Sequence, residues 1–393
     1  MRVNVFAAFL LSMVLTPHYI ASVSTVQPYQ MNYRVVLETT IVNGGQDDFD
    51  LTLNSYTDPS VPLFVSSELQ SVRVVDCSHQ LEEVIDRDGN PVGRFVINTV
   101  LHKGGSLTLS VEYLATVYLT DQRRSGPTPL LGPEHSGTKS EIPSSLVNNY
   151  CKAGGPWSLD DADDSWHKLR ELASQLAGNE SNVLAIALRL VEWVGKNVKY
   201  PGNRRDRISL PNETLAHLEG DCDEQSNLLI SMLRHVGVPA FLQTGALYVP
   251  SREVDQTLLS GHVRSIMSSI SWHAWSMAYV PPWGWLPFDM TIGYGGGSPT
   301  EAISDAASAT LSTIIAGSII TTDYVSEGNR AATELKRSEI HISEKQSIQP
   351  AAISAPRQDL VPILITVSAL VLFGMGIVGG YLLARMKRRT QSY

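Results

Sequence analysis

The chain has 393 residues, 43% of them hydrophobic and 18% charged, which excludes general disorder and leaves room for two or three domains. Its formal net charge is −9. Without Arg2 near the start and the four cations after residue 384, the rest of the chain has a net charge of −14. An acidic surface of this kind argues against nucleic acid and against anionic lipid headgroups as partners of the main body.

Residues 1–24 have the features of a secretory signal peptide. Arg2 gives a positive start, an apolar run covers residues 5–15, and Ala21 and Ser24 are small residues that suit a signal peptidase. The run is too short to span a bilayer comfortably. An uncleaved anchor is the alternative, but a Pro-His-Tyr stretch ends the apolar run early, so we predict an exported chain.

Residues 25–122 are predicted to form an all-β sandwich. The segments "YRVVLETTIV" and "SLTLSVEYLATVYL" alternate apolar and polar side chains with a period of two, and "VNGGQDD" and "DRDGNPVG" supply turns. We find no reactive set of residues in this region, which predicts a spacing or binding module. Residues 123–164 contain "RRSGPTPLLGPEHSG" and are predicted to be a linker and lead-in.

Residues 165–325 are predicted to form a second domain of helices and strands. Helical periodicity covers residues 165–178 and 181–198, and the second of these helices is apolar almost all round, as expected of a helix at the centre of a core. The stretch at 298–320 is rich in small residues and is predicted to add a closing helix and strand.

The three cysteines of the chain are Cys77, Cys151 and Cys222. Disulfides close readily in an exported protein, but three cysteines cannot all pair within one molecule. Pairing of Cys77 with Cys151 would join the two domains and leave the third thiol unbonded, whereas the alternative is three reduced cysteines. The sequence does not decide between these two states.

Cys222 lies where a turn gives way to a helix. Gly220 and Asp221 break the chain before it, apolar residues then recur at helical spacing, and Gly237 is followed by Pro239 beyond the predicted helix end. The amides of a first helical turn favour a thiolate, whereas the neighbouring acids oppose one. A buried filler and a zinc ligand are the alternatives for this residue, although the pattern lacks a CxxC or HxxxH pair.

A histidine and an aspartate follow in a predicted hairpin. His273 lies in the strand-like segment "SWHAWSMAYV", and "WLPFDMT" returns the chain after "PPWG". A hairpin centred on Pro281 would place His273 opposite Asp289, so that the carboxylate orients the imidazole. The three residues are thus candidates for nucleophile, base and orienting group. Four tryptophans are expected in the core or in cleft walls, and at least one of them is a candidate to line the cleft beside the histidine: Trp272, Trp275, Trp283 and Trp285. We interpret His262 and His235 as surface or helix-capping residues.

The C-terminal part is predicted to anchor the chain in a membrane. Residues 326–358 lack aromatic residues and periodicity and are predicted to be a flexible tether. Residues 359–384 contain an uncharged stretch long enough to cross a bilayer as a helix, and the cations of residues 385–393 place that tail in the cytoplasm. We therefore predict a single-pass cell-membrane protein that is mostly extracellular, with at most a weak homodimer through the GxxxG spacing of Gly376 and Gly380.

The segments "VEWVGKNVKYPGN", "GDCDEQSNLLISMLRHVGVPA" and "HAWSMAYVPPWGWLPFDMT" resemble the transglutaminase-like superfamily, the papain-related cysteine enzymes. The resemblance covers roughly residues 165–291. It implies an α+β fold with a papain- or transglutaminase-like core, in which a helix bearing the cysteine packs on an antiparallel sheet. It also implies Cys222 as the nucleophile, His273 as the general base and Asp289 as its orienting partner.

The resemblance further implies acyl transfer on peptide or amide bonds through a thioester, without a cofactor or a metal. A protein or peptide at the cell surface is the expected substrate, and we favour hydrolysis over cross-linking to an amine. Met277 stands where many members carry an acidic residue, and the acidic "DCDE" stretch is also atypical, so the substrate and the acidity of the thiol are not fixed by the motif. The backbone amide of Cys222 and the side chain of Tyr200 are candidate oxyanion donors. A non-catalytic binding or adhesion module is the alternative function.

Overall fold

The computed structural model describes residues 30–51, 60–67, 69–118, 132–152, 154–157, 164–201, 207–292, 303, 306 and 313–351. The contacts divide the chain into residues 1–351 and 352–393, so all described residues belong to the first unit. The predicted signal peptide, membrane helix and cytoplasmic tail lie outside the described residues. Within the described part, none of the helices combines the length and the apolar character that a membrane crossing requires.

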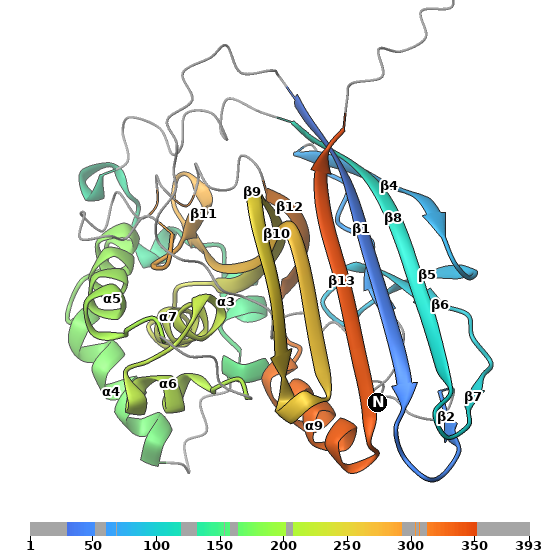
Figure 1. Cartoon of the computed structure of the whole chain (residues 1–393). Helices are drawn as coiled ribbons and strands as arrows, with labels where there is room; N and C mark the ends of the chain where they lie inside the picture. The colour runs from blue at the N-terminus through green and yellow to red at the C-terminus, as the bar shows by residue number, and fades with distance from the viewer. Residues whose placement is uncertain are drawn as a thin grey trace, which may run out of the picture. The chain divides into compact units, whose positions relative to one another are not determined.

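One large, curled sheet runs through the whole first unit. It has the strand order β12-β9-β10-β13-β1-β8-β4, with β11 paired to β10. Its neighbours are antiparallel except for β10 and β13, which run parallel. Figure 1 shows these strands side by side, with β13 between β10 and β1. The strands are β1 (Gln30–Asn43), β4 (Gln70–Cys77), β8 (Ser106–Tyr118), β9 (Ala240–Leu258), β10 (Val263–Val280), β11 (Gly284–Phe288), β12 (Thr313–Ile319) and β13 (Ile340–Pro350).

Two small sheets pair the remaining strands of the N-terminal region. The three-stranded sheet has the order β3-β6-β5, and β2 pairs with β7. These strands are β2 (Phe49–Asp50), β3 (Ser60–Pro62), β5 (Leu81–Ile85), β6 (Pro91–Phe95) and β7 (Val100–Leu101). Phe64, which follows β3, joins this region to the large sheet, because its ring meets Tyr113 of β8 at 5.0 Å and Trp272 of β10 at 6.2 Å.

The helices gather beside the β9–β10 part of the sheet, as Figure 1 shows for α4 to α7. The helices are α3 (Ser144–Tyr150), α4 (Asp164–Ala177), α5 (Val183–Asn197), α6 (Pro211–His217), α7 (Cys222–His235) and α9 (Tyr324–Arg337), with short 3-10 turns η3 (Pro133–His135), η4 (Lys139–Glu141), η5 (Gly155–Trp157) and η6 (Leu259–Gly261). The two helices predicted before Cys222 are therefore present as α4 and α5. The mixed α+β architecture is the one the sequence predicts.

Helix α7 lies at the centre of this arrangement. Every side chain from Cys222 to Arg234 is buried, the polar ones included, and the helix packs on both β10 and β9. Arg234 shows how a charge is accommodated there. Its guanidinium donates to the carbonyls of Ala240 and Ile320 and stacks 4.4 Å from the ring centre of Trp157. Burying polar groups with partners in this way fixes the position of the helix that carries the cysteine.

The sequence prediction of a flexible tether over residues 326–358 is wrong for its described part. Helix α9 and strand β13 occupy residues 324–337 and 340–350. The strand alternates buried and exposed positions, but two of its inward side chains, Glu344 and Gln346, are polar. Gln346 accepts a hydrogen bond of 2.6 Å from the indole of Trp272. Because polar residues stand at buried positions, the period-two signal of this strand is hidden in the sequence.

The boundary predicted near residue 122 does not separate two cores. Strand β13 pairs with β1 on one side and with β10 on the other, and one hydrophobic cluster contains Val35, Tyr113 and Trp272 together. The predicted N-terminal strands exist, but their main sheet continues into that of the second region. Cys77 and Cys151 are both thiols in the structure, which is the reduced alternative that the sequence left open.

Two side-chain amides occupy the outer edge of β12. Gln70 donates to the carbonyl of Ile315 and accepts from its amide, both at 2.7 Å. Asn90 does the same for Ser318, at 2.8 and 2.7 Å. An open sheet edge exposes unpaired backbone groups, and these amides imitate the next strand. They also connect β12 to the N-terminal region, because Gln70 lies in β4 and Asn90 in the β5–β6 turn.

We expect Gln70→Ala to lower the free energy of unfolding by about 2–4 kcal/mol, because it leaves the buried amide and carbonyl of Ile315 without these partners. Urea denaturation of the two proteins measures the difference. Gln80→Ala removes an exposed amide and is the matched control, with an expected change within about 0.5 kcal/mol. Equal losses in the two variants would contradict the edge-covering role.

Candidate active site

The chain approaches α7 through a tightly fixed turn. The amide of Asp221, the N-cap residue, donates to Glu224 Oε2 at 3.1 Å, and the amide of Ser209 donates to Glu224 Oε1 at 2.7 Å. Gly220 is required by space, because a Cβ there would lie 2.9 Å from the Cβ of Glu224 and 3.0 Å from Thr214 Cγ2. The prediction that Cys222 occupies the first turn of a helix is confirmed.

The predicted hairpin is present, with a small difference in register. Ser276 of β10 pairs with Phe288 of β11, and Val280 pairs with Gly284, so the hairpin is centred on Pro282 rather than on the preceding proline. Strand β11 ends at Phe288, which pairs with Ser276, so the paired part of the hairpin does not extend as far as His273.

The aspartate nevertheless meets the histidine. Asp289 follows the end of β11, and its Oδ2 is hydrogen-bonded to Nε2 of His273. Both side chains are about 3% exposed, so this pair forms in a solvent-poor interior where such a contact is strong. The prediction that Asp289 lies beside His273 is confirmed, although it results from the turn after β11 rather than from direct cross-strand pairing.

The second oxygen of Asp289 is held by the following turn. Its Oδ1 accepts from the amide and the hydroxyl of Thr291, both at 2.8 Å, and from the amide of Ile292 at 3.1 Å. Burial alone would raise the pKa of Asp289, but the charge and hydrogen bond of His273 and the donors of Thr291 outweigh it, and the pKa is lowered. The group is therefore a fixed carboxylate at neutral pH.

This carboxylate determines which nitrogen of His273 can act as a base. A carboxylate only accepts, so Nε2 carries the proton that it donates to Asp289, and the neutral ring has its lone pair on Nδ1. Among the described residues, buried Nδ1 has no hydrogen-bond partner. Trp275 stacks on the same ring at 5.9 Å between centroids, so it is the one of the four candidate tryptophans that lies beside the histidine ring in this contact.

The sulfur of Cys222 reaches the same segment of β10. It accepts a hydrogen bond from the backbone amide of Ala274, the residue that follows His273. The negative charge of Asp289 also acts on the thiol. Together, these contacts bring all three predicted residues to one place, although they come from the start of a helix, the middle of a strand and the turn after another strand.

The thiol of Cys222 is held neutral. Complete burial raises its pKa well above the ordinary value, the charges of Asp221 and Asp223 raise it further, and the hydrogen bond from Ala274 lowers it only in part. Ligand atoms of Asp221, Cys222 and Asp223 lie within 4.8 Å of one another, which explains the strength of the carboxylate effect. Burial and the two acids therefore outweigh the helix N-terminus, and the sulfur needs a base in order to react.

A buried polar network under the helix was not predicted from the sequence. The hydroxyl of Tyr324, from α9, donates to Asp223 Oδ2 at 2.9 Å and accepts from Asn227 at 2.5 Å, and Asn227 accepts from the indole of Trp157 at 3.1 Å. Burial raises the pKa of Asp223. The only sequence signal was an acid in the first helical turn, which is more commonly an exposed residue.

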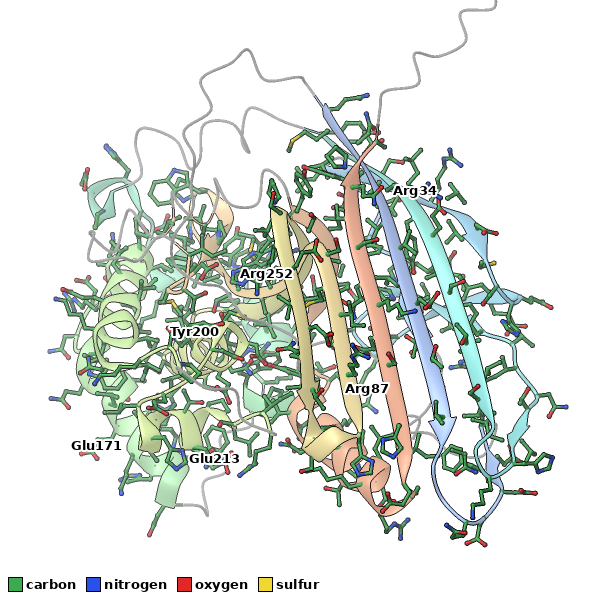
Figure 2. All side chains as sticks on the ribbon, viewed as in Figure 1. Arg34, Arg87, Glu171, Tyr200, Glu213 and Arg252 are labelled. Carbon is green, nitrogen blue, oxygen red and sulfur yellow. The ribbon has the colours of Figure 1, made fainter. Side chains whose placement is uncertain are left out.

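Tyr200, the candidate oxyanion donor, has a charged neighbour in the described structure. Figure 2 labels it together with Arg252 of β9. Burial lowers the pKa of Arg252, and its interaction with Tyr200 raises it in part. The role of Tyr200 as an oxyanion donor stays a prediction, as does that of the Cys222 amide.

We expect Asp221→Asn to increase the rate of Cys222 alkylation by iodoacetamide severalfold at pH 8. Asn keeps the helix cap but removes the negative charge, so the pKa of the thiol falls and more thiolate is present. Mass spectrometry of the peptide containing residue 222 measures the rate, with the Cys77 peptide as internal reference. Glu171→Gln on exposed α4 is the control, and an equal acceleration there would contradict the local effect.

We expect Asp223→Asn to raise the free energy of unfolding at pH 7 by roughly 1 kcal/mol, and by less at pH 4. The pKa of this acid is raised, so its stabilising contribution is present below its unfolded pKa and is lost as the pH rises through the folded value. Asn still accepts from the hydroxyl of Tyr324. Urea denaturation at both pH values tests this, with exposed Glu82→Gln as control; a variant less stable than wild type at pH 7 would contradict the expectation.

A profile of the transglutaminase-like superfamily matches residues 170–290. A search of curated proteins gave no match. Among solved structures, this chain is similar to a "putative cysteine protease" from Cytophaga hutchinsonii, with 16% identity, a TM-score of 0.46 and coverage of 83% of this chain and 92% of that one. It is also similar to a "putative protease" from Parabacteroides distasonis ATCC 8503, with 12% identity, a TM-score of 0.22 and coverage of 67% of each chain. The segment that matches the transglutaminase-like superfamily contains Cys222, His273 and Asp289.

Proposed function

We propose that the protein is a cysteine-dependent acyl-transfer enzyme that acts on peptide or amide bonds through Cys222, His273 and Asp289. The observation that carries the proposal is the state of the histidine. Its Nε2 is committed to an ionised carboxylate, its Nδ1 lone pair is unused, and the next residue of the same strand contacts the cysteine sulfur. Structural histidines in a core commonly satisfy both nitrogens, whereas a catalytic base needs one of them available.

The raised pKa of the thiol determines the order of events. Because Cys222 is neutral at rest, its proton passes to Nδ1 of His273 as the sulfur attacks the carbonyl carbon. The carbonyl oxygen becomes an oxyanion, and the imidazolium is stabilised by Asp289. When the tetrahedral intermediate collapses, the carbon–nitrogen bond breaks, the leaving amine takes the proton from His273, and a thioester remains on the sulfur.

Hydrolysis completes this cycle. His273 removes a proton from water, the resulting hydroxide attacks the thioester, and the sulfur leaves and regains the proton. Burial supports water as the acceptor. Cys222 is 1% exposed and His273 2% exposed, so a small molecule reaches the thioester with less displacement of the surrounding side chains than a lysine amine does.

The sequence supports a location for this activity at the outer face of the cell membrane. The features of residues 1–24 support export, and the uncharged stretch within residues 359–384 with its following cations supports a single membrane crossing. A protein or peptide outside the cell is then the substrate class.

A second candidate function is supported by the buried, neutral thiol itself. A cysteine that is 1% exposed with a raised pKa is also what a retained but inactive fold would contain. In that case the protein is a binding or adhesion module, and His273 and Asp289 form a structural pair.

Trapping of the acyl-enzyme distinguishes the two functions. We expect the wild-type chain, incubated with a peptide library and quenched in acid, to carry a thioester on the peptide containing residue 222. Cys222→Ala abolishes this adduct, His273→Ala slows its formation by roughly 10³-fold, and Asp289→Ala slows it by roughly 10²-fold or more. Mass spectrometry measures the adduct and identifies the bound fragment.

His235→Ala is the matched control for this experiment, because His235 lies at the other end of α7 and is expected to leave adduct formation unchanged. Unchanged adduct formation in His273→Ala would show that the imidazole is not the base. Absence of an adduct in the wild type, together with binding of peptides by both wild type and Cys222→Ala, would favour the binding module.

A further inference from the structure

Two histidines and a glutamate come together far from the active-site cysteine. His262 follows η6 and immediately precedes β10, whereas Glu339 and His341 lie at the start of β13. The parallel pairing of β10 with β13 begins at Val263 and Ile342, which brings these segments side by side. Figure 1 shows the β9–β10 connection next to α9 and the start of β13 at the lower end of the sheet.

The hydrogen bonds of the two imidazoles define which nitrogen is available. His262 Nδ1 lies 3.0 Å from the carbonyl of Ile340, and His341 Nδ1 lies 3.2 Å from the carbonyl of Gly261. A carbonyl can only accept, so both Nδ1 atoms carry the proton and each neutral ring has its lone pair on Nε2. Histidines that bind metals are commonly oriented in this way by a backbone carbonyl.

The three side chains lie close to one another. Each can offer one ligand atom such that the three atoms lie within 4.8 Å of one another. The two rings stack with centroids 4.7 Å apart and an angle of 12°. Glu339 adds a carboxylate from the exposed side, so a cation has a path from solvent.

Space for an ion at His341 depends on a glycine. A Cβ on Gly44, the residue after β1, would lie 3.1 Å from His341 Nε2 and 3.0 Å from its Cδ2. Gly44 also donates its amide to the carbonyl of Glu339 at 2.9 Å, which holds the β13 turn against the end of β1. The edge of the ring that carries the lone pair therefore faces a position without a side chain.

We propose that His262, Glu339 and His341 form a zinc-binding site. Two imidazoles and one carboxylate are a ligand set that Zn²⁺ accepts, with water completing the coordination. Imidazole nitrogen disfavours Ca²⁺ and Mg²⁺, which prefer oxygen ligands. This assignment replaces the interpretation of His262 as a surface or capping residue.

The proposed ion has a structural role and takes no part in the reaction. His273 lies further along β10 than His262. At about 3.3 Å per residue the two histidines are roughly 36 Å apart along the strand, so the ion does not meet the substrate. Its ligands come from both partners of the parallel β10–β13 pair. Zinc therefore clamps the strand that carries the catalytic histidine to the strand that joins the two regions.

Titration of the full-length chain with Zn²⁺ tests the site. The protein is purified in detergent, stripped with a chelator and dialysed, and binding is measured by calorimetry and thermal unfolding. We expect one strong site per chain and a rise in Tm of about 5 °C at a hundredfold excess of Zn²⁺ over its Kd. In His262→Ala and in Glu339→Gln the Kd increases at least tenfold and the rise in Tm disappears.

One conservative test variant and two controls keep the outcome clear. Glu339→Gln changes an exposed side chain without altering its size, so it tests the site without a change in side-chain packing. His167→Ala removes an exposed histidine from α4 and leaves binding unchanged. Cys222→Ala also leaves it unchanged; loss of binding in that variant places the ion among Asp221, Cys222 and Asp223 and overturns the proposal. Equal binding of Zn²⁺ by wild type and Glu339→Gln would also overturn the proposal, as would no binding by the wild type at micromolar Zn²⁺.

Discussion

The hydrogen bond between His273 Nε2 and Asp289 Oδ2 is the contact on which the proposed chemistry of this protein depends. It fixes the tautomer of the imidazole, keeps the carboxylate ionised in a solvent-poor interior, and leaves one nitrogen available beside the start of α7. The surrounding fold holds these groups in place. The turn after β11 binds the second carboxylate oxygen, and the backbone of β10 places Ala274 against the sulfur of Cys222.

The electrostatics around Cys222 favour the neutral thiol, which the proposed reaction would activate only when the substrate is attacked. A helix N-terminus lowers the pKa of a thiol, but here burial and two flanking carboxylates act in the opposite direction and are stronger. A neutral buried thiol is protected from adventitious alkylation and oxidation, since the thiolate is the reactive form. Asp223 contributes to this state and is itself held by Tyr324, so the acidity of the Cys222 thiol is linked to the position of α9.

The sequence predicted the local features of the site well and the long-range ones poorly. Apolar periodicity and the Gly-Asp break located α7, and the hairpin pattern brought His273 to Asp289 with a register that was wrong by one residue at its centre. The continuity of the sheet was not visible, because Glu344 and Gln346 occupy inward positions of β13 and remove the apolar alternation by which strands are recognised. Gln70 and Asp223 were also missed because they are polar residues at buried positions. The side chain of Gln70 completes a sheet edge, and Asp223 has the sequence pattern of an ordinary acid at the start of a helix.

The position of β13 has a consequence for biosynthesis. This strand is nearly the last described segment, yet it fills the place between β1, the first, and β10. Until it has been made, the long strands β1 and β10 have no common neighbour, and the pairs that β13 forms join opposite ends of the polypeptide, as in Tyr33 with Pro350. Such non-local closure is slow, and unpaired edges attract other chains during the delay. A nascent polypeptide that stops short of residue 340 therefore lacks the strand that joins β1 to β10, and the unit of residues 1–351 can fold completely only after that strand has been made.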